Sequence, residues 1–320
     1  MSLDARTAQW LEGLAASGLP PLNALPVPAA REAFAGAVSA YGIATSAAAR
    51  IEERSVETPH GDVPVRLYTP EGSGPFPVLV YFHGGGWVLG DLDTADGVCS
   101  YLATHSHAVV ASVGYSLSPE ARAPIAAEQC HAVTQWVADN AALVNADPER
   151  IAVGGDSAGA NLAAVVALMA REAAGPRLVH QLLFYPVVTR QTDAESYAAY
   201  GDGYFLTKAM MEWFFDHYLD GGDGTDWRIS PLAAKSLAEL PEAHVIVAEC
   251  DPTRDDAEKF AADLAAAGTT VTLQRFTGQI HGFVSLAEAM PEGKAALADA
   301  AARLRGTFRR GWEPRVWLAR

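Results

Sequence analysis

Apolar runs that stop near glycine or proline alternate with helical stretches along most of this chain, and this alternation limits its possible folds more than any other feature. The run PVLVYF at 77–82 is continuous, as expected for a strand buried on both faces of a sheet. Other strand patterns occupy residues 62–70, 108–115, 150–155, 180–186, 244–250 and 271–276, and helical patterns separate most of them. Such alternation indicates βαβ crossovers. We therefore predict an α/β fold with a mostly parallel central sheet flanked by helices.

Two segments do not follow this alternation. Residues 1–50 carry helical patterns without strands, and residues 190–235 form a long insertion that includes the amphipathic stretch TKAMMEWFFDHYLD. An aromatic-rich insertion of this length is typical of a lid or cap, although extra core packing would explain it as well. We predict N-terminal cap helices over 1–50, a catalytic domain over 51–189 and 236–320, and a cap insertion over 190–235.

The composition excludes several classes of protein. Half of the residues are apolar, which excludes disorder, and the net charge of -15 disfavours binding to nucleic acid or to an anionic membrane surface. The first residues, MSLDARTAQWLEGL, lack the apolar core of a signal peptide, so we place the protein in the cytoplasm. Cys99, Cys130 and Cys250 are too scattered for a disulfide framework or a zinc site.

A possible nucleophile lies in the pentapeptide GDSAG at 155–159, which matches the pattern G-x-S-x-G. It follows the strand at 150–155 and precedes a helix, the context that a nucleophile elbow requires. Gly155 and Gly159 fit this turn because a Cβ atom at either position would clash with neighbouring backbone. Ser157 is then the expected nucleophile, and a serine that merely caps a helix is the alternative.

A glycine-rich loop, His83-Gly84-Gly85-Gly86-Trp87, ends the strand at 77–82. Successive glycines let backbone N–H groups approach a ligand closely, as an oxyanion hole requires, although tight turns use glycine too. Because the GDSAG pentapeptide follows about 70 residues later, we expect the oxyanion donors to be the N–H groups of Gly85, Gly86 and Ala158.

A serine nucleophile needs a base and an acid that orients it. His281 is the expected base, because it lies in a glycine-flanked loop near the C-terminus, whereas His83 fits a structural hydrogen bond better. Asp251 is the expected acid, because it comes first after the strand at 244–250. Asp255 and Asp256 begin a helical pattern, where acids often act as caps.

The sequence indicates no metal and no cofactor. His105 and His107 form a pair without a third ligand nearby, and GGDSAG lacks both the lysine of a phosphate-binding loop and the spacing of a dinucleotide site. The basic C-terminal stretch FRRGWEPRVWLAR is expected to be a solvated tail or a subunit contact.

Together these motifs resemble the hormone-sensitive-lipase-like branch of the α/β-hydrolase family, which contains bacterial carboxylesterases and acetyl esterases. HGGGW, GDSAG, DPTRD from Asp251 and HGF from His281 stand in that family's order. The resemblance implies an α/β-hydrolase fold with a cap formed by both unusual segments. The chain departs from the family at Ser116, Gln129 and Thr253, where arginine, an acid and leucine are common; losing the first two together is consistent with a dispensed salt bridge.

We therefore expect a serine carboxylesterase that hydrolyses short- to medium-chain acyl esters, with a small-molecule ester as its partner. An amidase or acyltransferase with the same triad, or a non-catalytic binding module, are the alternatives. Residues expected to bind substrate, unless they are plain core, are Trp87, Tyr185, Phe205, Leu206, Phe214 and Phe283. An open sheet edge near HVIVAE and VTLQRF leaves a homodimer as an option.

Overall fold

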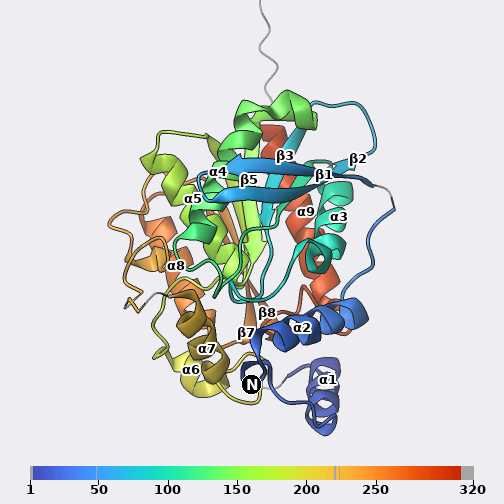
Figure 1. Cartoon of the computed structure of the whole chain (residues 1–320), viewed down its shortest axis with the longest axis vertical. Helices are drawn as coiled ribbons and strands as arrows, with labels where there is room; N and C mark the ends of the chain where they lie inside the picture. The colour runs from blue at the N-terminus through green and yellow to red at the C-terminus, as the bar shows by residue number, and fades with distance from the viewer. Residues whose placement is uncertain (1–2, 48, 220, 223, 311–320) are drawn as a thin grey trace, which may run out of the picture.

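A computed structural model describes residues 3–47, 49–219, 221–222 and 224–310, and it contains an eight-stranded sheet of order β1-β2-β4-β3-β5-β6-β7-β8 (Figure 1). The strands are β1 (Ala49–Thr58), β2 (Gly61–Pro70), β3 (Phe76–Phe82), β4 (Val109–Val113), β5 (Ala146–Asp156), β6 (Leu178–Phe184), β7 (Glu242–Cys250) and β8 (Val271–Ile280). Strand β2 runs antiparallel to β1 and β4, and the other neighbouring pairs are parallel. The predicted mostly parallel sheet is confirmed.

Helices cover both faces of this sheet (Figure 1). Helices α3 (Leu92–Ser106) and α9 (Glu292–Arg310) pack on one face, and α4 (Ile125–Asp139), α5 (Ala158–Glu172) and α8 (Arg254–Ala266) pack on the other. All seven residues of β3 are buried, and they alternate between the faces: Val80 and Phe82 join the core on the α5 side, while Leu79 and Tyr81 join the core on the α3 side. This two-sided burial explains the continuous apolar run.

Strand β1 is a difference between the sequence pattern and the structure. We expected helices without strands up to residue 50 and the first strand at Asp62, whereas β1 already begins at Ala49. It lies at the edge of the sheet and exposes most of its side chains, so it carries no apolar alternation. The other edge strand is β8. This strand contains the run VTLQRF and lies beside β7, which contains HVIVAE, so the open edge expected near these two runs is confirmed.

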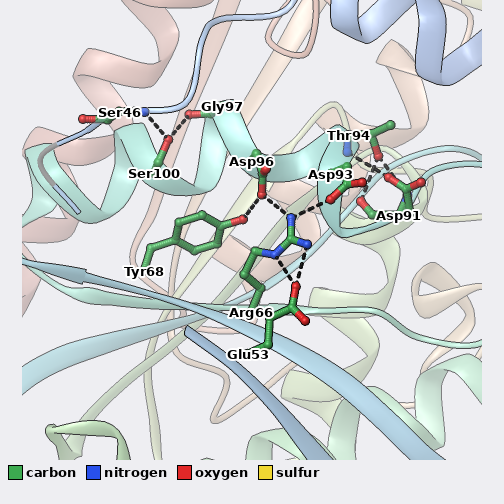
Figure 2. A network of polar contacts seen from close by, with 10 residues as sticks. All are labelled: Ser46, Glu53, Arg66, Tyr68, Asp91, Asp93, Thr94, Asp96, Gly97 and Ser100. Carbon is green, nitrogen blue, oxygen red and sulfur yellow. Dashed lines mark hydrogen bonds and ion pairs between the residues drawn. The ribbon is translucent and has the colours of Figure 1, made fainter. Parts of the chain in front are cut away.

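A partly buried arginine connects the β1–β2 edge to α3, as Figure 2 shows. Arg66 on β2 donates to Glu53 on β1 at 2.8 Å and to Asp93 and Asp96 on α3 at 2.7 Å each. Its side chain is only 15% exposed, and Tyr68 donates a further hydrogen bond to Asp96. Because α3 begins shortly after the glycine-rich loop, this network also helps to fix where that loop ends.

The remaining helices include those of the two unusual segments, which lie at the carboxyl ends of the parallel strands (Figure 1). They are α1 (Ala5–Ala16), α2 (Val27–Tyr41), α6 (Glu195–Tyr200) and α7 (Lys208–Tyr218), with short 3-10 turns at Leu22–Ala24, Ala141–Val144 and Pro231–Ala233. The N-terminal helices form a cap over this end of the sheet. These helices do not connect neighbouring strands of the sheet, so they pack on the surface that the sheet and its covering helices leave exposed, here the strand ends.

One side chain on the cap helix α2 contacts two loops of the sheet domain. Arg31 donates to the backbone oxygens of Val88 at 2.8 Å and Ser118 at 3.0 Å, and its guanidinium pairs with Glu120 at 2.7 Å. The Arg31 hydrogen bonds lower the pKa of the Glu120 carboxyl. Residues 311–320 of the basic C-terminal stretch lie outside the described residues. Among the residues that are described, no helix combines the length and apolar character needed to cross a membrane.

Candidate active site

Ser157 stands in a sharp turn between β5 and α5. Its φ angle of 55° lies in the left-handed region that side chains rarely adopt, as a strained elbow requires. A Cβ atom on Gly155 would lie 2.4 Å from the carbonyl oxygen of Phe82, and one on Gly159 would lie 1.9 Å from it. The expected clash at both glycines is confirmed, because the turn passes directly against the end of β3.

His281 lies between Ser157 and Asp251. Its Nε2 atom is 2.7 Å from Ser157 Oγ, and its Nδ1 atom is 2.7 Å from Asp251 Oδ2. The three residues come from the ends of β5, β7 and β8, whose parallel direction brings their carboxyl ends to one edge of the sheet. The imidazole is 5% exposed and Asp251 is fully buried, so water does not compete for these hydrogen bonds.

Thr253 supports Asp251 on the side away from the imidazole. Its backbone N–H and its hydroxyl donate to Asp251 Oδ1 at 2.8 and 2.9 Å. The carboxylate is therefore held by the histidine on one oxygen and by Thr253 on the other. The hydroxyl of this residue, where the family commonly has leucine, thus provides a second donor in addition to the backbone.

The alternative acids and the alternative base take other roles in the structure. Asp255 accepts a hydrogen bond from the backbone of Ser196 at 2.8 Å, and burial raises the pKa of Asp256 to about 6. The ring of His83 stacks on Tyr115 with centroids 4.3 Å apart, and its Nδ1 atom donates to the Gly84 carbonyl oxygen at 2.8 Å. Burial lowers the pKa of His83, which keeps it neutral and structural.

The glycine-rich loop lies beside Ser157. Gly85 and Gly86 have φ angles of 112° and 61°, and both line the same cavity as Ser157. A Cβ atom on Gly86 would lie 2.2 Å from the ring of Phe214, so this α7 residue can approach only because position 86 is glycine. Ala158 is the first residue of α5, where a helix leaves its N–H groups without acceptors inside the helix. Of the three expected oxyanion donors, Gly85 and Gly86 thus line the cavity with Ser157, and Ala158 directly follows the serine at the start of α5.

A mostly apolar cavity opens beside Ser157. The cap and the sheet domain both contribute to its walls. Its lining residues are Leu22, Phe34, Ala37, Val38, Gly85, Gly86, Leu89, Asp156, Ser157, Tyr185, Phe205, Leu206, Met210, Phe214, His281, Gly282, Ser285 and Leu286. Of the side chains expected to bind substrate, Tyr185, Phe205, Leu206 and Phe214 lie in this lining.

The prediction that Trp87 and Phe283 bind substrate is wrong, because neither residue lines the cavity. The Trp87 ring is fully buried and stacks on Tyr218 with centroids 4.4 Å apart. Phe283 is also fully buried, and its ring packs against Tyr185 at 5.7 Å and Phe276 at 5.1 Å. Both residues follow site residues in the chain, but their side chains turn into the core, where large apolar groups are most stable.

Several lining residues were missed by sequence reasoning. Asp156 precedes the serine inside the recognised motif, so its position carried a signal that was not used. Phe34, Val38 and Met210 gave no such signal, because they lie on α2 and α7, far from the motifs in the chain, and meet them only by packing. Ser285 lies four residues after His281 and is a further missed residue.

The departures at 116 and 129 form a neutral pair. Gln129 Oε1 accepts from the Ser116 N–H at 2.8 Å, and its Nε2 atom donates to the Ser116 hydroxyl oxygen at 2.9 Å. Two direct hydrogen bonds thus join these positions without any charge, which is consistent with the dispensed salt bridge. Among the described residues, no group of three or more His, Cys, Asp or Glu is placed to hold a metal ion.

A family model described as the alpha/beta hydrolase fold matches residues 79–285, which is more than half of the chain. The chain belongs to the α/β-hydrolase family, among its carboxylic ester hydrolases. The carboxylic ester hydrolase LipN of Mycobacterium tuberculosis (strain ATCC 25618 / H37Rv) is 43% identical over 243 residues, which cover 74% of this chain and 65% of LipN. The chain thus spans slightly less than two thirds of that relative.

Two further relatives match this hydrolase over nearly its whole length. Ethyl acetate hydrolase of Pseudomonas putida is 34% identical over 94% of this chain and 98% of the relative. The crystallised ester hydrolase from the metagenome of Lake Arreo, solved with a bipyridine phosphonate derivative, has a TM-score of 0.93 and 36% identity. That match covers 96% of this chain and 99% of the solved one.

Proposed function

We propose that this carboxylic ester hydrolase cleaves short- to medium-chain acyl esters with Ser157 as nucleophile, His281 as base and Asp251 as the orienting acid. The observation that carries the proposal is the position of His281, which lies 2.7 Å from Ser157 Oγ on one nitrogen and 2.7 Å from Asp251 on the other. An imidazole held in this way can accept the serine proton while its other N–H group stays oriented.

In the acylation step, Ser157 Oγ attacks the ester carbonyl carbon as His281 Nε2 takes its proton. The carbonyl oxygen becomes an oxyanion, which the N–H groups of Gly85, Gly86 and Ala158 stabilise; losing one such donor costs about 100- to 1000-fold in rate in other enzymes. His281 then returns the proton to the departing alcohol oxygen, and the acyl group remains on Ser157.

In the deacylation step, a water molecule attacks the acyl carbonyl and gives a proton to His281 Nε2. Collapse of the second tetrahedral intermediate releases the acid and restores the Ser157 hydroxyl. Asp251 remains an anion throughout, and its two oxygens hold the imidazole and accept from Thr253.

The cavity walls support short to medium acyl groups without charge. Phe34, Phe205, Leu206, Met210 and Phe214 contribute apolar surface, and the described part of the chain places no lysine or arginine in the lining. Burying a negatively charged acyl chain among such residues without a cationic partner is unfavourable. The similarity to ethyl acetate hydrolase over nearly the whole chain supports the small end of this range.

Hydrolysis of p-nitrophenyl esters from C2 to C12 tests the proposal. We expect turnover to peak below about C8, because the bulky apolar side chains that line the cavity leave little room for longer chains. Ser157→Ala and a serine-directed organophosphate should each abolish turnover. Activity within a few-fold of the parent in Ser157→Ala would refute the role of this serine, and a maximum at C8 or longer would refute the chain-length preference.

Matched ester and amide substrates with the same acyl group separate an esterase from an amidase. The triad attacks both carbonyls in the same way, so only the departing group differs. We expect the ester to be cleaved at least 100-fold faster (about 3 kcal/mol), and comparable rates would favour the amidase.

A further inference from the structure

Asp156 is a buried carboxylate next to the nucleophile that the triad does not use. It is 8% exposed, and it accepts hydrogen bonds from three segments of the chain. Its Oδ1 atom accepts from Tyr81 Oη and from the Gly84 N–H, both at 2.9 Å. Its Oδ2 atom accepts from Ser285 Oγ at 3.0 Å. The same carboxylate therefore holds the loop that follows His281 and the start of the glycine-rich loop at 83–87, called the oxyanion loop below because it carries two of the expected oxyanion donors.

The approach of the oxyanion loop to Asp156 depends on glycine. A Cβ atom on Gly84 would lie 2.4 Å from Asp156 Oδ2. Gly84 directly precedes the two expected oxyanion donors, Gly85 and Gly86, so a shift of the carboxylate would shift the loop that carries them. Asp156 itself precedes Ser157, so its position is tied to the elbow.

Ser285 connects this carboxylate with a tyrosine. Its hydroxyl has one proton, which it donates to Asp156, so the contact of 3.2 Å with Tyr185 Oη has the tyrosine as donor. The order of donation is thus Tyr185 to Ser285 to Asp156. Ser285 lines the cavity at Ser157 and also a smaller cavity behind the oxyanion loop, which is lined by His83, Gly84 and Thr94 among others.

Tyr185 in turn packs beside the catalytic imidazole. Its ring centroid is 4.7 Å from that of His281, and its own φ angle of 36° is unusual for a large side chain. A backbone held in this region needs support from its surroundings. The Tyr185 N–H donates to the Ile246 carbonyl oxygen at 2.6 Å, and its hydroxyl is held by Ser285.

We propose that Ser285 is a positioning residue that couples the His281 loop to the oxyanion loop. Its hydroxyl holds Tyr185, whose ring packs against the His281 imidazole. The same hydroxyl donates to Asp156, which accepts from the Gly84 N–H at the start of the oxyanion loop. A substrate carbonyl must be close to His281, Ser157 and the oxyanion donors at once, so this connection sets the geometry in which all three act. The inference rests on the proposed function, because it concerns the rate of that reaction.

Ser285→Ala removes both hydrogen bonds of the connection, and Ser285→Thr retains the hydroxyl. We expect Ser285→Ala to lower kcat about 10-fold with KM within about twofold, because displaced catalytic groups slow the chemical step more than they weaken binding. Ser285→Thr should recover most of the lost kcat. Tyr185→Phe, which keeps the ring and removes the hydroxyl, should give a smaller loss in the same direction.

A double-mutant cycle tests whether the two hydroxyls act together. If they belong to one connection, Ser285→Ala combined with Tyr185→Phe should cost about as much as Ser285→Ala alone. If the double variant instead loses kcat by the product of the two single losses, the coupling through Tyr185 is overturned. The matched control is Ser100→Ala, a fully buried serine outside both cavities whose hydroxyl donates to Gly97 (Figure 2), and it should keep the parent kcat.

The outcomes separate this inference from the proposed function. A parent without esterase activity would overturn both. An active parent that Ser157→Ala abolishes, with kcat in Ser285→Ala within twofold of the parent, would overturn the positioning role alone. If Ser285→Ala does not fold, Ser285→Thr and Tyr185→Phe decide: parent-like kcat in Tyr185→Phe overturns the role, and a selective loss in kcat supports it.

Discussion

Two buried histidines predict that the protein loses stability in mild acid. His180 on β6 and His244 on β7 are 1% and 0% exposed, and they lie under α9. Burial is the main cause that lowers the pKa of His180 to about 3 and that of His244 to about 4, from the usual 6.5. The charges of His244, Arg310 and Arg303 lower the pKa of His180 further. Arg303 also lowers the pKa of His244, whereas Asp299, 3.4 Å from His244 Nε2, raises it.

The sign and size follow from proton linkage. Unfolded histidine binds a proton as the pH falls below 6.5, while these two stay neutral in the folded protein until the pH approaches 4 and 3. Protons therefore favour the unfolded chain, and stability falls as the pH drops through this window. At pH 5 each group costs about 2 kcal/mol relative to pH 7.5, so the pair costs about 4 kcal/mol.

Urea unfolding at pH 7.5 and pH 5.0 measures this loss. In His180→Gln combined with His244→Gln, neither group can titrate, so the drop in the free energy of unfolding between the two pH values should be about 4 kcal/mol smaller than in the parent. Contributions from other groups, including Asp256, are common to both proteins and cancel. His105→Gln, an exposed histidine, is the control and should behave like the parent. An equal drop in parent and double variant would refute the reasoning.

Three further predictions concern the site and the cap. Thr253→Val keeps the side-chain volume but removes the hydroxyl that donates to Asp251. Because this carboxylate then lacks one donor, the free energy of unfolding in urea should fall by about 1–3 kcal/mol, and Thr253→Ser should recover it. An unchanged free energy of unfolding in Thr253→Val would contradict the role of the hydroxyl. Gly159→Ala places a Cβ atom 1.9 Å from the Phe82 carbonyl oxygen, so the elbow must shift and esterase activity should fall at least about 10-fold, while parent-like activity would show that the turn can relax. Arg31→Ala removes the hydrogen bonds that hold α2 to Val88 and Glu120. The cavity wall that α2 forms should then give way to longer acyl chains, so the ratio of kcat/KM for octanoate to kcat/KM for acetate esters should rise several-fold. An unchanged ratio in a chain-length series would show that Arg31 does not hold the cavity wall.

Much of the fold could be predicted because its signals are local. The buried strand β3 reads as a continuous apolar run, since both of its faces are covered. Strand β1 could not be recognised, because it takes its place from pairing with β2 along its whole length while most of its side chains face solvent. Backbone hydrogen bonds to a neighbour stabilise such an edge strand, and they leave no pattern in its side chains.

The candidate site likewise has features that the local sequence predicts and features that only the packing reveals. By itself, the sequence predicted the residues to which our proposal assigns the chemistry: GDSAG at an elbow, HGGG after a strand, and a histidine and an aspartate at strand ends. Each of these signals depends on backbone geometry that a few adjacent residues specify. Only the tertiary structure decided that Phe34 and Phe214 line the cavity, that Trp87 and Phe283 turn into the core, and that Ser285 meets Asp156. These contacts join residues far apart in the chain, and the packing of the cap and loops against the sheet, rather than any local preference, brings them together.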